Sequence, residues 1–475
     1  MSIMCTTQVP ARPICSQEVP INRWVTYGYA VEVSMEKHLG VPQNGMGHLE
    51  EEIRIQTLKI QREILEHTIQ KKSDLTPPLC PHCQSKLKKL KKIERTLQSA
   101  FGPVTFQRLR GYCPKCKKWV CPADHALKID DHATASPAIQ ELSALMVSKM
   151  PVSEAQAVIS RITGQRLSRA TLAREAKRQG KRAEDIENNL NNQISKGCIP
   201  EELERKSLDA PFTMVVQIDA WNIRERNDWG ISNSLRQKGE EPERWHWVYG
   251  AIAYRLEDCQ SVGNKERERI LHKAVVMTRG GVDTLREKLW AECIRLGIGK
   301  AERILVLGDG AAWIWNLAKD RFVDAEQRVD FYHVSQHLWA VAKDLFTDNK
   351  QEAKKWVHKQ QKALKNNKVG NVIKKLRELE NGMVDAVAKI AAKEANYLES
   401  HQKRMKYAIP KNGKEPIGSG SIESCCRQYQ CRFKRTGQFW SREGDEALLI
   451  LENSWRNDRW KTLFPHVDTS NYGMN

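Results

Sequence analysis

Two short apolar segments that each end in an aspartate constrain the fold of this chain more than any other feature. Met214–Ile218 is followed by Asp219, and Ile304–Gly308 is followed by Asp309. Short apolar runs bounded by turn residues are typical of buried β-strands. A carboxylate at the tip of a buried strand is costly unless another group pairs with it or uses it. The two segments therefore predict a sheet with two acidic strand ends.

The surrounding pattern predicts the rest of this sheet. Strands are expected at Thr213–Asp219, Trp247–Leu256, Leu271–Thr278, Arg303–Leu307 and Arg328–Tyr332, with helices at Asp283–Leu296 and Ala311–Phe322. Three strands, a helix, a strand, a helix and a strand form the order of a mixed α/β sheet of the RNase H-like kind. In that fold the first and fourth strands are neighbours, so Asp219 and Asp309 would meet at one edge.

Glu423 is the third acid, and it lies at the start of a predicted helix that Gly437 is expected to end. Positions 423, 427, 430 and 434 share one polar face, whereas Ile422, Cys426, Tyr429 and Phe433 share an apolar face. Three converging carboxylates suit two Mg²⁺ (or Mn²⁺) ions and phosphoryl transfer. The metal ligands and catalytic residues would be Asp219, Asp309 and Glu423. The alternative is a surface helix with a Glu423–Arg427 ion pair.

Two cysteine pairs, Cys80-Pro-His-Cys83 and Cys113-Pro-Lys-Cys116, are separated by 29 residues. This spacing predicts a zinc-ribbon-like module in which four thiolates hold one structural Zn²⁺. Cys121 and His125 are alternative ligands. Redox chemistry is less well supported, because there are two pairs and no adjoining βαβ pattern.

Residues 153–182 read as a helix, a glycine turn and a second helix capped by Ser168. The second helix begins at Arg169 and carries exposed cations, the pattern of a helix-turn-helix. A plain helical spacer is the alternative reading.

The net charge of +19 is concentrated in two segments. Residues 86–118 hold 11 Lys/Arg and one acid, and residues 350–408 hold 15 Lys/Arg and six acids. Such segments favour a polyanion, and double-stranded DNA is the predicted partner. The expected DNA contacts are Lys88, Lys89, Lys91, Lys92, Arg169, Arg427, Lys434 and Arg435. A solvated charged face is the alternative.

We expect neither a membrane span nor a signal peptide, hence a cytoplasmic protein with reduced cysteines. The predicted organisation is a multidomain α/β chain. Its parts are a loosely ordered tail (1–45), a helix with the zinc module (46–130), the helix-turn-helix region (131–205), the core's first part (206–345), a basic helical insertion (346–415), the core's last part (416–460) and a tail (461–475).

Four segments of the sequence resemble those of a known family. Gly418–Ser424 followed by Arg432–Trp440 resembles the end of the catalytic core in bacterial insertion-sequence transposases of the ISKra group, within the Mutator-like DDE transposases. Leu307–Trp313 is similar to that family's second-aspartate segment, and Asp330-Phe-Tyr-His333 is similar to its C/DxxH element. The resemblance covers roughly residues 75–460.

The resemblance implies that Asp219, Asp309 and Glu423 are a DDE triad and that the 340–410 helices are an insertion common in the superfamily. It implies cleavage of transposon ends and strand transfer into target DNA, by a homodimer in a synaptic complex. The rival hypotheses are a nuclease without strand transfer and a non-catalytic, zinc-containing DNA-binding regulator.

For several accessory residues the sequence indicates two alternative roles. His333 and His337 could bind metal or a scissile phosphate, or could be structural, and Asp330 and His333 could instead hold the insertion against the core. Trp313, Trp315 and Trp339 are expected to pack in the core, with stacking on a flipped base as the alternative. Cys425, Cys426 and Cys431 have no convincing ligand spacing.

Overall fold

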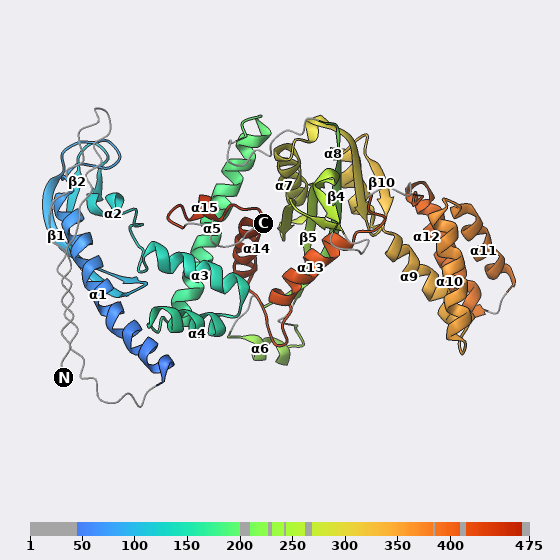
Figure 1. Cartoon of the computed structure of the whole chain (residues 1–475), viewed down its shortest axis with the longest axis horizontal. Coiled ribbons are helices and arrows are strands. Elements are labelled where there is room, and N and C mark those ends of the chain that lie inside the picture. The colour runs from blue at the N-terminus through green and yellow to red at the C-terminus, as the bar shows by residue number, and fades with distance from the viewer. Residues whose placement is uncertain are drawn as a thin grey trace.

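The computed structural model describes residues 45–199, 210–226, 230–241, 244–261, 268–382, 385–408 and 415–467. Nearly all of the predicted N-terminal tail, and the last residues of the C-terminal tail, lie outside these ranges. The molecule is elongated (Figure 1). A small sheet with helix α1 (Met46–Leu75) lies at one end, and the five-stranded sheet lies nearer the middle. The other end is formed by α10 (Lys350–Lys365), α11 (Val369–Gly382) and α12 (Asp385–His401).

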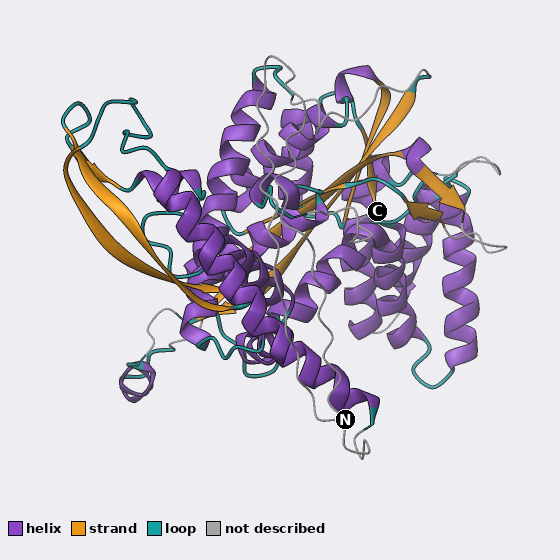
Figure 2. Ribbon diagram, turned by 60° about the vertical axis from the view of Figure 1, so that its left-hand side comes forward, coloured by secondary structure: helices purple, strands orange, loops and turns teal. Residues whose placement is uncertain are grey.

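The first module is a long helix packed on a three-stranded antiparallel sheet of order β1-β2-β3. Its elements are α1 (Met46–Leu75), β1 (Lys88–Ser99), β2 (Gly102–Cys113), β3 (Lys118–Val120) and α2 (Pro122–Ala126). Figure 2 shows the β1–β2 hairpin as a long, curved ribbon at the edge of the molecule. Leu97, Val104 and Phe106 form its small core.

Three helices follow: α3 (Pro137–Lys149), α4 (Val152–Thr163) and α5 (Arg169–Ser195). Gly164 ends α4 in the left-handed conformation, at φ 70°. The Ser168 side chain accepts a hydrogen bond from the Thr171 amide, which confirms its predicted N-cap role. The predicted helix, glycine turn and capped helix are therefore present.

The central sheet has the order β10-β9-β4-β5-β8. Its strands are β4 (Phe212–Glu225), β5 (Arg244–Arg255), β8 (Ala274–Thr278), β9 (Ala301–Gly308) and β10 (Glu326–Val329). β5 is antiparallel to β4 and β8, whereas β9 is parallel to β4 and β10 is parallel to β9. The expectation that the first and fourth strands pair is confirmed. Short elements connect these strands: α6 (Ser232–Gln237), η1 (Leu256–Asp258), β6 (Cys259–Ser261), β7 (Glu268–Ile270) and η2 (Ile298–Lys300).

Three predicted strands and one predicted helix end needed correction. The strand expected to end at Asp219 continues to Glu225, because β4 stays paired with β5 as far as Arg244, so Asp219 lies beyond the pairing with β9 but not at the strand tip. The strand expected from Leu271 begins only at Ala274. The strand expected to reach Tyr332 ends at Val329, because the Asp330 side chain accepts from the His333 amide and caps the next helix. The helix carrying Glu423 ends at Phe433, and Gly437 lies in a turn beyond it at φ 71°.

Helices cover both faces of the sheet and divide the core into two apolar clusters. One cluster includes residues of α7 (Gly281–Arg295), α8 (Ala312–Arg321) and α9 (Phe331–Leu345). The other joins α3–α5 to α13 (Gly420–Phe433), α14 (Arg442–Arg456) and α15 (Trp460–Leu463). The helices before residue 200 thus share an apolar core with the sheet.

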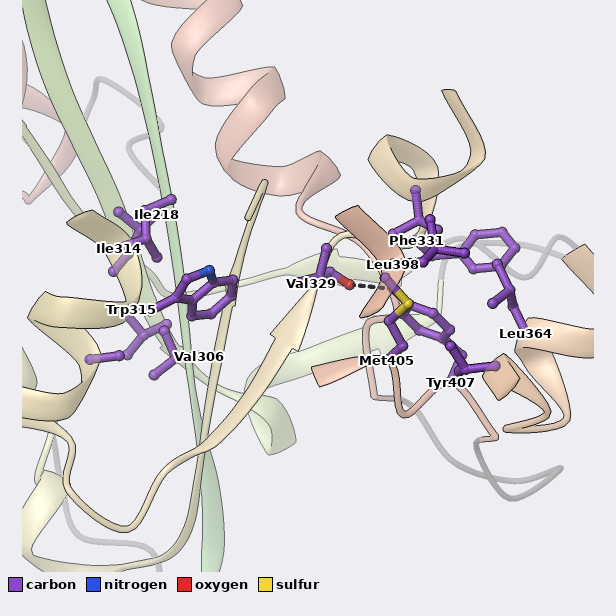
Figure 3. Packing of buried hydrophobic residues seen from close by; sticks show 14 of the residues in the cluster. Ile218, Val306, Ile314, Trp315, Val329, Phe331, Leu364, Leu398, Met405 and Tyr407 are labelled. Atoms are coloured by element: carbon purple, nitrogen blue, oxygen red, sulfur yellow. Dashed lines mark hydrogen bonds between the residues drawn. The ribbon is translucent and has the colours of Figure 1, made fainter. Parts of the chain in front are cut away.

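The insertion consists of α10 (Lys350–Lys365), α11 (Val369–Gly382), α12 (Asp385–His401) and η3 (Gln402–Arg404). Its apolar side chains belong to the same cluster as α9 and the sheet. Figure 3 shows Leu364, Leu398 and Met405 gathered around Phe331 and Tyr407. The Tyr407 hydroxyl donates to the carbonyl of Val329, at the end of β10, over 2.9 Å. The insertion is therefore packed onto the sheet.

Candidate functional site

Asp219 and Asp309 lie at matching positions on neighbouring parallel strands. The last paired residues of β4 and β9 are Gln217 and Leu307, and each aspartate lies two residues beyond its member of that pair. Hydrogen-bonded strands are roughly 4.8 Å apart. Each carboxylate also accepts a local main-chain amide: Ala220 donates to Asp219 over 2.7 Å and Ala311 donates to Asp309 over 2.9 Å. The strand pairing thus brings two of the three predicted acids together.

Glu423 reaches the same edge because two polar contacts hold the start of α13. The amide of Ile422 donates to the side-chain oxygen of Gln217, which is fully buried on β4, over 3.1 Å. Ser419, in the preceding loop, donates through its hydroxyl to Asp330 over 2.9 Å and also through its amide. The same hydroxyl lies 3.3 Å from Glu423. Asp330 therefore ties this loop to the end of β10 rather than holding the insertion.

The three acids interact electrostatically. Burial raises the pKa of Asp219 above its ordinary value, and the negative charges of Asp309 and Glu423 raise it further. A hydrogen bond with Cys426, one turn after Glu423 on α13, acts in the opposite direction. Burial and the nearby Asp219 in turn raise the pKa of Cys426. The site therefore concentrates negative charge that a bound cation would relieve.

The predicted faces of α13 are confirmed. Ile422, Cys426, Tyr429 and Phe433 are buried, whereas Glu423, Arg427, Gln430 and Lys434 are half-buried or exposed. Arg427 lies 3.6 Å from Glu423, so the ion pair of the alternative reading is also present.

Helix α12 of the insertion reaches the acidic edge with three side chains on one face. The Tyr397 hydroxyl donates to the carbonyl of Asp309 over 2.9 Å. His401 lies next to Gly310, where an added Cβ would be 2.6 Å from the Tyr397 oxygen and 3.3 Å from the His401 Nε2. Glu394 hydrogen-bonds to Nδ1 of His337. The insertion therefore forms one wall of the site.

His333 and His337 are one turn apart on α9, as predicted, with ring centroids 5.0 Å apart. The His337 ring also stacks on Tyr397 at 3.9 Å. Burial lowers the pKa values of His337 and His401, although Glu394 acts in the opposite direction at His337. Burial therefore disfavours the charged form of both imidazoles.

Within the described ranges, only one group of three or more cysteine, histidine or acidic side chains brings its ligand atoms within 4.8 Å of one another, and it is the four cysteines. Asp219, Asp309 and Glu423 interact at longer range. Rotation of carboxylate side chains would be needed before they shared an ion.

The four-cysteine cluster joins the turn after α1 to the β2–β3 turn. Cys80 and Cys116 sulfurs are 3.9 Å apart, and those of Cys83 and Cys113 are 3.5 Å apart. Tetrahedral Zn–S bonds of about 2.3 Å place sulfurs about 3.8 Å apart. The cluster could therefore bind zinc, and Cys121 and His125 are not part of it.

The predicted DNA contacts differ in their surroundings. Lys88, Lys89, Lys91 and Lys92 are exposed on β1. In contrast, Lys434 donates to the Asn222 side chain over 2.8 Å, and Arg435 pairs with Glu154 over 2.8 Å. Arg169, at the start of α5, is exposed and lies 3.4 Å from Gln156. Lys434 and Arg435 therefore already have partners within the fold.

The basic segment at 86–118 also contains two arginines with a structural role. Arg95 and Arg108 both pair with the buried Asp124, and Arg95 lies 2.6 Å from it. These two charges hold the hairpin against α2, so the exposed lysines provide most of the positive charge that this segment presents to solvent.

The sequence interpretation missed Gln217, Ser419, Glu394, Tyr397 and His401. Gln217 carried a usable signal, because it is the one polar residue in the apolar run before Asp219. Glu394, Tyr397 and His401 recur at helical spacing, but no local pattern indicates which partner a helix of the insertion will contact.

The fold and site define a multidomain α/β protein with a mixed five-stranded sheet, an acidic edge and a four-cysteine cluster. Residues 296–459 match the model of an uncharacterised protein family, UPF0236. The matched segment contains Asp309, Asp330, the insertion and Glu423, but neither Asp219 nor the cysteine cluster. Comparison with curated proteins gave no match. Of the described helices, none is both long and apolar enough to cross a membrane.

Proposed function

We propose that this chain is a DDE-type DNA transposase with an RNase H-like catalytic core, similar to insertion-sequence transposases of the ISKra group. The observation that carries the proposal is the meeting of Asp219, Asp309 and Glu423 at one sheet edge, from positions up to 204 residues apart in the sequence. Like charges that lie close together in a partly buried site destabilise a fold unless a bound cation compensates them, so such sites are often functional. Metal-dependent phosphoryl transfer would be such a function.

The acidic edge suits Mg²⁺ or Mn²⁺ held by Asp219, Asp309 and Glu423. The raised pKa of Asp219 is consistent with this fit, because burial and then the charges of Asp309 and Glu423 disfavour its charged form, and a bound cation would relieve both effects. Bound divalent ions would supply activation of the attacking oxygen and stabilisation of the leaving oxygen. The chain itself contributes Gln217 and Asp330, which orient the start of α13, and Tyr397, which holds the main chain at Asp309.

DNA recognition would fall to the two modules before residue 200. The zinc-ribbon-like hairpin offers Lys88, Lys89, Lys91 and Lys92 to phosphates. The pair α4–α5 offers the exposed first turn of α5, which in a helix-turn-helix enters the major groove. A homodimer would pair the two element ends. Because phosphate contacts release counterions, binding should weaken steeply as salt rises.

The experiment is cleavage of a plasmid that carries the DNA flanking the gene on both sides. Wild-type protein with Mg²⁺ should cut at the element ends, and Asp309→Asn should retain binding while losing at least about 10³-fold in cutting. Asp320→Asn, an exposed acid on α8, is the matched control and should cut normally. Undiminished cutting by Asp309→Asn would contradict the proposal.

A second assay separates the rival functions. Pre-cut ends with free 3′-hydroxyls should be joined to a target plasmid by a transposase. A nuclease would cut without joining, and a regulator would bind without doing either.

A further inference from the structure

The β4–β5 hairpin extends beyond the central sheet and exposes large aromatic side chains. Trp245 and Trp247 are 58% and 56% exposed. They lie two residues apart on β5, so their side chains point to the same side of the strand. Removing these two rings from water would be favourable, yet no part of the described fold covers them. Exposed tryptophans in this arrangement indicate a binding surface.

Positive groups lie beside these rings. Arg224 is opposite Trp245 in the strand register, and its guanidinium lies 5.3 Å from the centre of that ring. The same guanidinium lies 4.8 Å from the ring of Phe439. Arg226 lies 3.9 Å above Phe439. Lys434 reaches Asn222, which is opposite Trp247. Aromatic rings interleaved with cations match a polyanion whose units have flat faces.

The aromatic row continues toward the acidic edge. Tyr249 follows Trp247 on the same side of β5, and its ring packs edge-on against Trp313 at 5.1 Å. Trp313 is on the first turn of α8, four residues after Asp309. From Trp245 to Tyr249 the strand rises about 13 Å. Through Trp313 the row leads from the hairpin toward Asp309, on the face of the sheet opposite the Asp219 side chain.

The spacing suits stacked bases. Residues two apart on a strand are separated by about 6.6 Å, roughly twice the ~3.4 Å rise per base of a DNA strand. Each tryptophan ring could thus contact one face of an unpaired base. A base pair within a duplex exposes only its edges to a protein, so its faces are not accessible to these rings.

We propose that this surface (Trp245, Trp247, Arg224, Phe439 and Lys434) binds an unpaired DNA strand by base stacking and guides it toward Asp309. The inference rests on the proposed function only for the choice of DNA as ligand. The proposal concerns only the binding of a single strand. A protein that cuts DNA could lack this binding, and a protein that does not cut could still show it.

The test measures binding of a fluorescein-labelled oligodeoxythymidine and of a duplex by the full-length protein without added Mg²⁺. Trp245→Ala/Trp247→Ala should weaken single-strand binding by at least about fivefold per ring and leave duplex binding unchanged. Trp245→Phe/Trp247→Phe should restore most of the affinity. Trp339→Ala removes another exposed tryptophan, on α9 and 40% exposed, and should bind as wild type. Single-strand binding by the alanine variant equal to that of Trp339→Ala would overturn the proposal.

A second measurement needs no variant. Ultraviolet crosslinking of wild-type protein to a bromodeoxyuridine-containing single strand should label the tryptic peptide 245–255, which trypsin releases by cutting after Arg244 and Arg255. Labelling confined to other peptides would show that the strand binds elsewhere and that the exposed rings serve a different partner.

Discussion

The Tyr397 hydroxyl donates a hydrogen bond to the main-chain carbonyl of Asp309 over 2.9 Å, across 88 residues of sequence. Tyr397 belongs to the helical insertion and Asp309 to the end of a sheet strand. Burial raises the pKa of Tyr397 above its ordinary value, and the charge of Asp309 adds to this effect. The phenol therefore remains protonated and stays a donor. The insertion and the acidic edge are in direct contact.

Tyr397→Phe tests this contact. Removing the hydroxyl leaves the Asp309 carbonyl without that donor, which costs about 1 kcal/mol or more. We expect the rate of DNA cutting to fall roughly fivefold or more while DNA affinity stays unchanged, measured as a loss in kcat without a change in KM. Tyr332→Phe, on the exposed side of α9, is the matched control. Equal rates for both variants would show that the bond does not position Asp309.

Gly180→Ala tests the packing of α5 on α14. An added Cβ at Gly180 would lie 2.5 Å from the Cβ of Ala447 and 2.6 Å from its Cα. Alanine is favoured over glycine within a helix by about 1 kcal/mol, but backbone cannot move aside as a flexible side chain can. We expect a net loss of about 1–3 kcal/mol, measured by thermal or urea unfolding.

Gly382→Ala is the comparison variant, because nothing lies within 4 Å of the added Cβ there. It should be neutral or slightly stabilising. If Gly180→Ala behaves the same way, α5 and α14 can accept a methyl group at this contact without loss of stability.

The four cysteines should hold about one Zn²⁺ per chain. Cys113→Ser should lose the zinc measured by atomic absorption, and the β1–β2 module should unfold at lower temperature, because such sites supply on the order of 10 kcal/mol to folding. Cys431→Ser, an exposed cysteine on α13, should keep its zinc. Full zinc content in Cys113→Ser would exclude this ligand set.

Asp445 predicts an unusual dependence of stability on pH. It is buried next to Glu225, and burial together with that neighbour raises its pKa from 3.8 to about 9, although Arg279 lies 3.7 Å away and acts in the opposite direction. The folded state therefore keeps Asp445 protonated where the unfolded chain releases the proton. The stability from this group is complete below pH 3.8 and is lost as the pH rises toward 9.

Asp445→Asn should remove that loss, since asparagine cannot ionise. Its melting temperature relative to wild type should rise between pH 3.8 and about pH 9, the ordinary and raised pKa values, with a gain of up to about 1.4 kcal/mol per pH unit. Asp283→Asn, at an exposed position on α7, should show no such trend. A constant difference across this range would contradict the raised pKa.

Local patterns predicted much of the secondary structure. The strand before Asp309, the start of the strand that contains Asp219 and the buried face of α13 were each predicted correctly, because strand and helix periodicity depends on residues a few positions apart. The end of the Asp219 strand was wrong, because pairing with β5 extends it to Glu225. The Ser168 cap was predicted for the same reason. The predicted strand end at Tyr332 was wrong, because the Asp330 cap started a helix where apolar residues alone indicated a strand.

The sequence by itself determined which residues carry carboxylates and thiolates, and which faces of each element are apolar, since these depend on side-chain chemistry and local period. Only the tertiary structure decided that Gln217 holds the start of α13 and that Tyr397 contacts Asp309. Those contacts join segments 205 and 88 residues apart. They exist because sheet pairing and core packing bring distant polar groups together, and no local period encodes that arrangement.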